Sequence, residues 1–163
     1  MKKWALGGLI VLVALFVLIQ IVPYGRDHTN PPVTQEVKWD SARTRDLAVG
    51  ACYDCHSNLT TWPWYSNVAP MSWLIQKDVD EGREILNFTE WNRPQESESD
   101  EIVEVVREGE MPPWQYEPLH PAGRLSSSEQ GELALGLERT LAADPPAAGT
   151  SEPGSGREDG DDD

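Results

Sequence analysis

Cys52-Tyr53-Asp54-Cys55-His56 is the most informative stretch of this chain. The chain has only two cysteines, and they lie three positions apart with a histidine directly after the second. The pattern C-x-x-C-H is typical of covalent attachment of a c-type haem. The two thiolates form thioethers with the haem vinyl groups, and the histidine is thereby placed at one axial position of the iron. The stretch therefore predicts Cys52 and Cys55 as attachment points and His56 as an axial iron ligand.

Three other kinds of site also use two closely spaced cysteines. A thioredoxin-like redox pair normally follows a strand and opens a helix, and residues 42–50 do not have the pattern of a strand. A structural zinc site needs four Cys or His ligands, and no second cysteine pair follows. A disulfide between Cys52 and Cys55 leaves His56 without a role. We favour haem attachment because it explains all three residues.

An apolar run from Trp4 to Val22 is nineteen residues long and is interrupted by Gln20 near its end. A helix needs about 20 such residues to cross a bilayer. We therefore predict a transmembrane signal anchor over residues 1–22. The alternative is a cleaved signal peptide, whose apolar region is about 7–15 residues long and ends in a small-x-small site.

Lys2 and Lys3 precede this apolar run. The positive-inside rule then predicts a cytoplasmic N-terminus. We expect a single pass through the cytoplasmic membrane, with the haem domain on the periplasmic or extracytoplasmic side. Covalent haem attachment in bacteria takes place on that side, which agrees with the motif.

The chain is strongly acidic, with 28 acidic and 13 basic side chains and a formal charge of −15. Nucleic-acid surfaces require clustered Lys and Arg, so nucleic acid is excluded as a partner. Residues 144–163 consist mainly of Pro, Gly, Ser, Ala and acidic residues with almost nothing apolar, which predicts a disordered acidic tail. The tail has two interpretations, which are solubility and attraction of a basic partner.

Residues 39–143 have the length of one small domain, and the proline-containing residues 23–38 are expected to be a linker before it. The domain is expected to contain four helices and no strand. The signals for these helices are an Asp40 or Ser41 cap, a start after Pro70, a stretch from Ser99 that stops at Gly109, and the capping box of Ser126 and Glu129 before leucines at 133, 137 and 141. The predicted fold class is all-α, behind a single N-terminal transmembrane helix.

A haem iron bound by one histidine has a second axial position, which another side chain either fills or leaves open. Met111 follows the helix stop at Gly109 and precedes Pro112 and Pro113, so it lies on a rigid loop suited to hold a thioether against the iron. We predict Met111 as the second axial ligand, and the alternative is a core side chain. The other possible ligands are Met71, His120 and His28.

Aromatic residues are concentrated directly after the haem motif, in the run Trp62-Pro63-Trp64-Tyr65. Such a cluster is typical of core packing, and packing against a haem is a special case of it. We expect these three aromatic residues to contribute to the haem pocket. We also expect a backbone carbonyl, from Pro70 or Pro63, to orient the imidazole of His56.

With these residues identified, the chain resembles the small bacterial haem-binding domain family, a c-type cytochrome-like group, over about residues 39 to 141. The resemblance implies one covalently attached haem c, a cytochrome c-like helical fold and often an N-terminal membrane anchor, but no defined reaction. The motifs that carry it are Cys52 to Asn58, Trp62 to Tyr65, Ala69-Pro70 with Ser72-Trp73, Glu81-Gly82-Arg83, Asn87-Phe88, Gly109 to Pro113 and His120-Pro121.

We therefore expect a membrane-anchored, monohaem c-type cytochrome that transfers single electrons to or from a redox protein partner. Such a carrier needs no catalytic residue and no organic substrate, because the haem supplies the redox chemistry. The alternative is a haem-based gas or ligand sensor, or a peroxidase-like module, in which the sixth position of the iron is open or displaceable.

Overall fold

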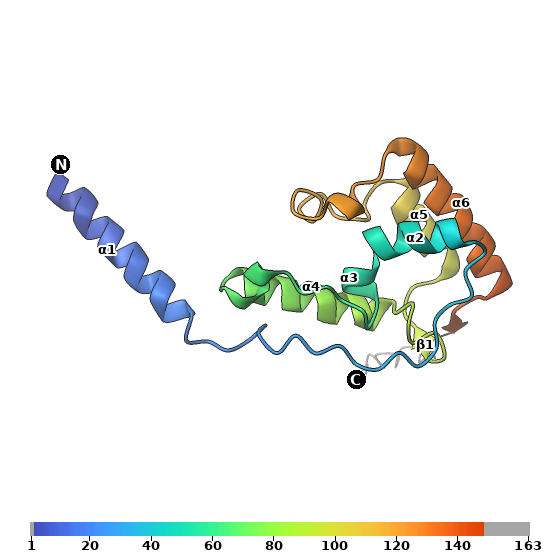
Figure 1. The fold of residues 1–163 in the computed structure, drawn as a ribbon, viewed down its shortest axis with the longest axis horizontal. Coiled ribbons are helices and arrows are strands. Elements are labelled where there is room, and N and C mark those ends of the chain that lie inside the picture. Colours follow the sequence, from blue (N-terminus) through green and yellow to red (C-terminus); the bar gives the residue numbers. More distant parts are fainter. Residues whose placement is uncertain (1, 149–163) are drawn as a thin grey trace, which may run out of the picture.

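A computed structural model of the chain describes residues 2–148, and most of the regular structure in it is helical. Figure 1 shows helix α1 projecting from one side of a domain formed by the other helices. The α-helices are α1 (Lys2–Ile19), α2 (Ala42–Ala51), α3 (Tyr53–His56), α4 (Met71–Ile85), α5 (Ser99–Arg107) and α6 (Ser127–Ala143). The 3₁₀ helices are η1 (Trp64–Asn67) and η2 (Pro121–Gly123), and the strands are β1 (Pro94–Gln95) and β2 (Ala147–Ala148).

Helix α1 is shorter than the predicted membrane anchor. The helix has 18 residues, begins with two lysines and ends at Ile19, three residues before the end of the apolar run. At 1.5 Å per residue, its apolar part is about 24 Å long. The hydrocarbon core of a bilayer is about 30 Å thick.

Among the residues that the structure describes, no helix is long and apolar enough to cross a membrane. The prediction of a transmembrane signal anchor is therefore wrong, and with it the part of the fold class that placed the domain behind such a helix. The predicted localisation, a single pass with the haem domain on the periplasmic side, is contradicted by the same finding.

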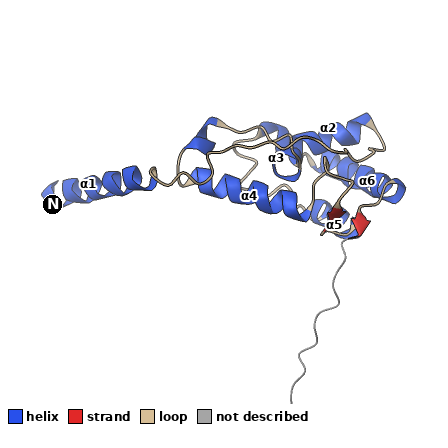
Figure 2. Cartoon of the chain, turned by 90° about the horizontal axis from the view of Figure 1, so that it is seen from below, coloured by secondary structure: helices blue, strands red, loops and turns tan. Residues whose placement is uncertain are grey.

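Gln20, directly after α1, joins the end of this helix to the domain. Its side-chain amide donates to the carbonyl of Ala69 at 2.9 Å, and its side-chain oxygen accepts from the backbone N–H of Ala69 at 3.0 Å. Arg26 donates to the same oxygen at 3.2 Å. The polar residue that interrupts the apolar run therefore binds the segment before α4. Figures 1 and 2 both show the end of α1 next to the start of α4.

The core of the domain lies between α2, α5 and α6. The predicted leucine repeat of α6 is confirmed, because Leu133, Leu137 and Leu141 are all buried. Residues Leu47, Ala48, Ile102 and Val106 complete this part of the core. Gly136 allows α2 to approach α6 closely, since a Cβ atom at this position would lie 2.2 Å from Oγ1 of Thr44.

The predicted helix signals are confirmed at both kinds of helix end. Ser41 is the N-cap of α2, and Ser126 and Glu129 form the capping box of α6. Gly109 has a φ of 77°, and it ends α5 with the two hydrogen bonds of a Schellman motif, from Gly109 N–H to Val106 and from Glu110 N–H to Val105.

The prediction of a domain without strands is corrected by a small parallel sheet. Pro94 pairs with Ala147, and Gln95 pairs with Ala148. In Figures 1 and 2 these strands lie at the end of the domain opposite α1. Strands of two residues are too short to show an alternating apolar pattern, so the sequence gives no signal for them.

The segments on either side of the domain contact it and each other. Val37 is buried, and its N–H donates to the carbonyl of Phe88 at 2.9 Å. The carboxylate of Asp144 accepts from the N–H of Lys38 at 3.0 Å. The division of the chain into linker, domain and tail stays a prediction, and residues 149–163 of the predicted tail lie outside the described residues.

Candidate haem site

The two cysteines and the histidine lie on one helical turn. Cys52 is the residue between α2 and α3, and its carbonyl accepts hydrogen bonds from the N–H groups of Cys55 and His56 at 3.2 and 2.8 Å. Residues three positions apart in a helical turn lie on the same face. Both cysteines are free. The donor set that thioether attachment requires is therefore present on one turn.

The imidazole of His56 is oriented through one of its two nitrogens. Its Nδ1 lies 2.9 Å from the carbonyl oxygen of Gly82 and 3.1 Å from that of Leu86, so Nδ1 is assigned as the N–H donor. Its Nε2 makes no hydrogen bond within the described part of the chain. Iron-binding histidines commonly donate one ring N–H to a carbonyl and use the other nitrogen as the ligand. The residues at this position therefore fit an axially bound haem.

Burial supports the same assignment. The apolar surroundings of His56 lower its pKa, although the carbonyls of Leu86 and Gly82 act in the opposite direction. A lower pKa favours the neutral imidazole, which is the form that binds metal ions.

The carbonyls that orient His56 are not the predicted ones. They come from the C-terminal end of α4, at Gly82 and Leu86, and not from Pro70 or Pro63. Gly82 makes this possible because a Cβ atom there would lie 2.7 Å from the carbonyl oxygen and 3.0 Å from the Cβ of Cys55. The available signal was a glycine within an otherwise helical pattern, which often marks close packing.

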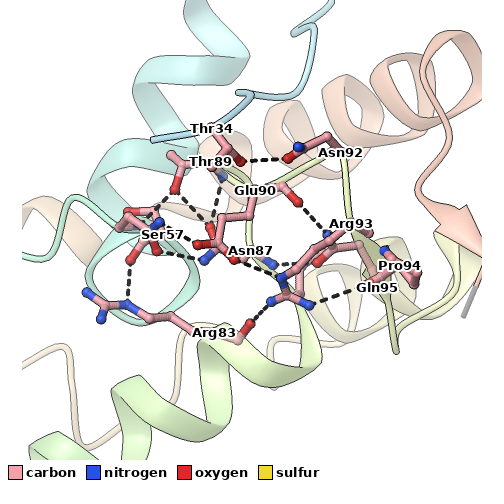
Figure 3. A network of polar contacts seen from close by, with 12 residues as sticks. Thr34, Ser57, Arg83, Asn87, Thr89, Glu90, Asn92, Arg93, Pro94 and Gln95 are labelled. Carbon is pink, nitrogen blue, oxygen red and sulfur yellow. Dashed lines mark hydrogen bonds and ion pairs between the residues drawn. The ribbon is translucent and has the colours of Figure 1, made fainter. Parts of the chain in front are cut away.

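A buried polar network holds the segment after the haem motif against the segment after α4. Asn58 donates from its backbone to Oγ1 of Thr89 at 2.7 Å, and the side-chain amide of Asn87 donates to the side-chain oxygen of Asn58 at 2.8 Å. Arg83 donates to the carbonyl of Ser57 at 2.8 Å. Figure 3 shows Ser57, Arg83, Asn87 and Thr89 of this network directed toward one another. The network therefore keeps His56 and the Leu86 carbonyl in register.

Burial also changes the chemistry of the free thiols. It raises the pKa of both Cys52 and Cys55 to about 12, and for Cys52 the neighbouring Cys55 adds to the effect. A redox-active cysteine pair requires the thiolate form at neutral pH, which a low pKa provides. The environment of these cysteines is therefore unlike that of a thioredoxin-type pair.

Met111 lies on the loop that follows α5. Its N–H donates to the carbonyl of Val105 at 3.1 Å, so its backbone is held by the end of that helix. On the other side of the loop, Gln130 of α6 donates to the carbonyl of Val106 at 2.8 Å. The side chain of Met111 is 38% exposed. Its role as the second axial ligand stays a prediction.

The two histidines that could replace Met111 already have partners. His120 has Nδ1 2.8 Å from the carbonyl oxygen of Tyr116 and Nε2 3.1 Å from the hydroxyl of Tyr65. His28 stacks on Trp62 with ring centroids 4.6 Å apart, and its Nε2 lies 3.1 Å from a backbone carbonyl oxygen. Both nitrogens of His120 are therefore engaged, whereas His28 makes its hydrogen bond through Nε2. Met71, the remaining possible ligand, is the first residue of α4.

The three aromatic residues after the motif lie in different surroundings. Trp62 donates from its indole N–H to the side-chain oxygen of Asn30 at 3.1 Å. Trp64 is 79% exposed. Tyr65 contacts His120. Pro70 is exposed and precedes the first turn of α4. A contribution of these four residues to a haem pocket stays a prediction.

Comparison with known proteins agrees with the chemistry of the motif. A family model described as a haem-binding domain matches residues 14–139, which is more than half of the chain. The matched region contains the two cysteines, His56, the orienting carbonyls and Met111. No curated protein and no solved structure matches the chain. The chain therefore belongs to the haem-binding domain family.

Proposed function

We propose that this haem-binding domain attaches one haem covalently and transfers single electrons. Cys52 and Cys55 are the thioether attachment points, and His56 is the first axial ligand. The observation that carries the proposal is the His56 imidazole, whose Nδ1 is bonded to the carbonyls of Gly82 and Leu86 next to two free cysteines on the same turn. This arrangement leaves Nε2 available to an iron, and neither sulfur is held in a disulfide.

When bound, the haem supplies an iron that alternates between the ferric and ferrous states, with a potential that depends on axial ligands and burial. The chain's own residues hold and orient this group. The Gly82 and Leu86 carbonyls keep the imidazole in one tautomer and make it a stronger ligand. Once the haem is attached, electron transfer needs no proton transfer or nucleophilic attack by a side chain.

We further propose Met111 as the second axial ligand. The support is that its backbone is held by α5, while both nitrogens of His120 are engaged elsewhere. A thioether ligand raises the reduction potential relative to a second histidine. The electron partner that suits this chain is a redox protein with a basic surface, because the chain carries a formal charge of −15.

Two measurements on the purified protein test covalent attachment and the axial pair. We expect haem to stay with the wild-type chain on a denaturing gel, and a Cys52→Ser/Cys55→Ser variant to lose it. We also expect a sulfur-to-iron charge-transfer band in the ferric spectrum, which Met111→Ala should abolish.

Either of two results would contradict this proposal. Loss of haem from the wild-type chain on the denaturing gel would exclude covalent attachment. Rapid binding of carbon monoxide to the ferrous protein, without the ferric charge-transfer band, would favour a gas or ligand sensor, or a peroxidase-like module, over an electron carrier.

A further inference from the structure

The loop between α5 and α6 carries Met111 and four prolines, and it contains no α-helix or strand. At its first end, the Schellman motif at Gly109 holds the chain to α5. Between Met111 and the start of α6, its position depends on contacts with other parts of the domain. Three such contacts attach it to the region of the haem motif.

The first contact joins the loop to the haem motif itself. The hydroxyl of Tyr116 donates to a carboxylate oxygen of Asp54 at 2.7 Å. Asp54 lies between the two attachment cysteines, and its other carboxylate oxygen accepts from the N–H of Thr61 at 2.9 Å. The carboxylate is therefore held from one side by the segment after the motif and from the other side by the loop.

The second contact joins the loop to η1. The ring of His120 stacks on that of Tyr116 with centroids 3.8 Å apart and an interplanar angle of 4°. Its Nδ1 lies 2.8 Å from the carbonyl oxygen of Tyr116, and its Nε2 lies 3.1 Å from the hydroxyl of Tyr65. His120 therefore connects Tyr116 to the aromatic run that follows the motif.

The third contact is a close approach of backbones that glycine allows. A Cβ atom at Gly50, near the end of α2, would lie 2.6 Å from the carbonyl oxygen of Ala122 in η2. A Cβ atom at Gly123 would lie 2.5 Å from the ring of Tyr116. The far end of the loop is thus packed against the helix that leads into the first cysteine.

We propose that Tyr116 and His120 are positioning residues, which hold the Met111 loop to the haem motif through Asp54 and Tyr65. This inference rests on the proposed function, in which Met111 is the second axial ligand. A functional group must be held within about 0.5 Å of its working position by the contacts around it. The backbone bonds within the loop, such as those from Tyr116 to Pro113 and from His120 to Glu117, join only residues three positions apart. The two side chains supply the contacts that attach the loop to the haem motif.

The test measures how fast the ferrous holoprotein binds carbon monoxide, because the gas must displace the second ligand. Tyr116→Phe removes one hydroxyl and keeps the ring that stacks on His120. We expect this variant to bind carbon monoxide about tenfold faster than wild type, which corresponds to the loss of one hydrogen bond to a charged group. Tyr65→Phe, which removes the partner of His120 Nε2, should act in the same direction.

A matched control is available one position before Asp54. Tyr53 also donates its hydroxyl to a carboxylate, that of Glu36, but it contacts Trp39 and Phe88 and not the loop. Tyr53→Phe should leave the rate of carbon monoxide binding within about twofold of wild type. Because it also loses one hydrogen bond to a carboxylate, it should lower the stability of the domain about as much as Tyr116→Phe does.

A double-mutant cycle separates positioning of Met111 from a general structural effect. In a Met111→Ala background, Tyr116→Phe should cause no further acceleration, because the ligand that it positions is already gone. Equal acceleration in both backgrounds would overturn the inference, and so would a wild-type rate in Tyr116→Phe. If wild type already binds carbon monoxide as fast as Met111→Ala, the proposed function itself fails.

Discussion

At the scale of single residues, the imidazole of His56 depends on a glycine 26 positions later in the chain. Its Nδ1 can reach the Gly82 carbonyl only because α4 lies directly against the turn of Cys55. The C-x-x-C-H pattern predicts Cys52, Cys55 and His56 as haem-binding residues, and it carries no signal for what orients the histidine. The pattern is local, whereas the orienting carbonyl belongs to another helix.

Gly82→Ala tests this contact. The added methyl group would meet backbone atoms of Cys55 at 2.7 Å and 3.1 Å, and backbone cannot move aside as a flexible side chain does. We expect the free energy of unfolding to fall by about 1–3 kcal/mol, measured by urea denaturation. Gly131→Ala in α6 is the control, because a Cβ atom there meets nothing within 4 Å. That variant should be up to about 1 kcal/mol more stable, and an equal loss in both variants would argue against close packing at Gly82.

At the scale of elements, the Met111 loop begins where α5 ends and ends where α6 starts. Gly109 ends α5 in a left-handed conformation, and the capping box of Ser126 starts α6. Both signals could be read from the sequence, since caps and stops depend on residues within one turn. The strand pair β1 and β2 could not be read, because it joins two-residue segments that are far apart in the chain.

Ser126→Ala tests the start of α6. The hydroxyl of Ser126 accepts from the N–H of Glu129 at 3.3 Å, and the Glu129 carboxylate accepts from the Ser126 N–H at 3.0 Å. Loss of such a cap costs about 0.5–2 kcal/mol of stability. Ser128→Ala is the control, because Ser128 is exposed in the same turn. Urea denaturation of the two variants should show a loss only for Ser126→Ala, and equal midpoints would exclude a contribution from the cap.

At the scale of the whole molecule, Glu36 ties the segment before α2 to the turn that carries the cysteines. Its carboxylate accepts from Arg45 at 2.7 Å, from Trp39 at 3.2 Å and from the hydroxyl of Tyr53. Burial alone would raise the pKa of Glu36, but the hydrogen bonds from Arg45, Tyr53 and Trp39 outweigh it and lower the pKa. The folded state therefore favours the ionised carboxylate.

This pKa shift predicts a loss of stability in acid. A carboxyl group whose pKa is lower in the folded state stabilises it above the unfolded value of 4.5, and this contribution is lost as the pH falls through the folded pKa. Protonation also relieves repulsion within a chain of charge −15, so the comparison must be with Glu36→Gln. The stability difference between wild type and this variant, measured in urea, should shrink from pH 7 to pH 3. A constant difference would contradict the assignment.

The outcome for helix α1 shows where sequence patterns are insufficient. A run of apolar residues predicted a membrane span, and composition alone supported it. The helix ends at Ile19, and the next residue, Gln20, binds Ala69 in a contact that joins residues 49 positions apart. No pattern within the run records such a partner, so the length of the helix could not be predicted from it.

The chemistry of the site was encoded locally, whereas its geometry was not. Two thiols and an imidazole at fixed spacing predict haem attachment because covalent bonding to one group would constrain their positions along the chain. The carbonyls that orient His56, the contact between Nε2 of His120 and Tyr65, and the Tyr116–Asp54 bond arise only when distant segments pack together. These contacts depend on the folded arrangement because each one joins segments whose separation in the sequence carries no periodic signal.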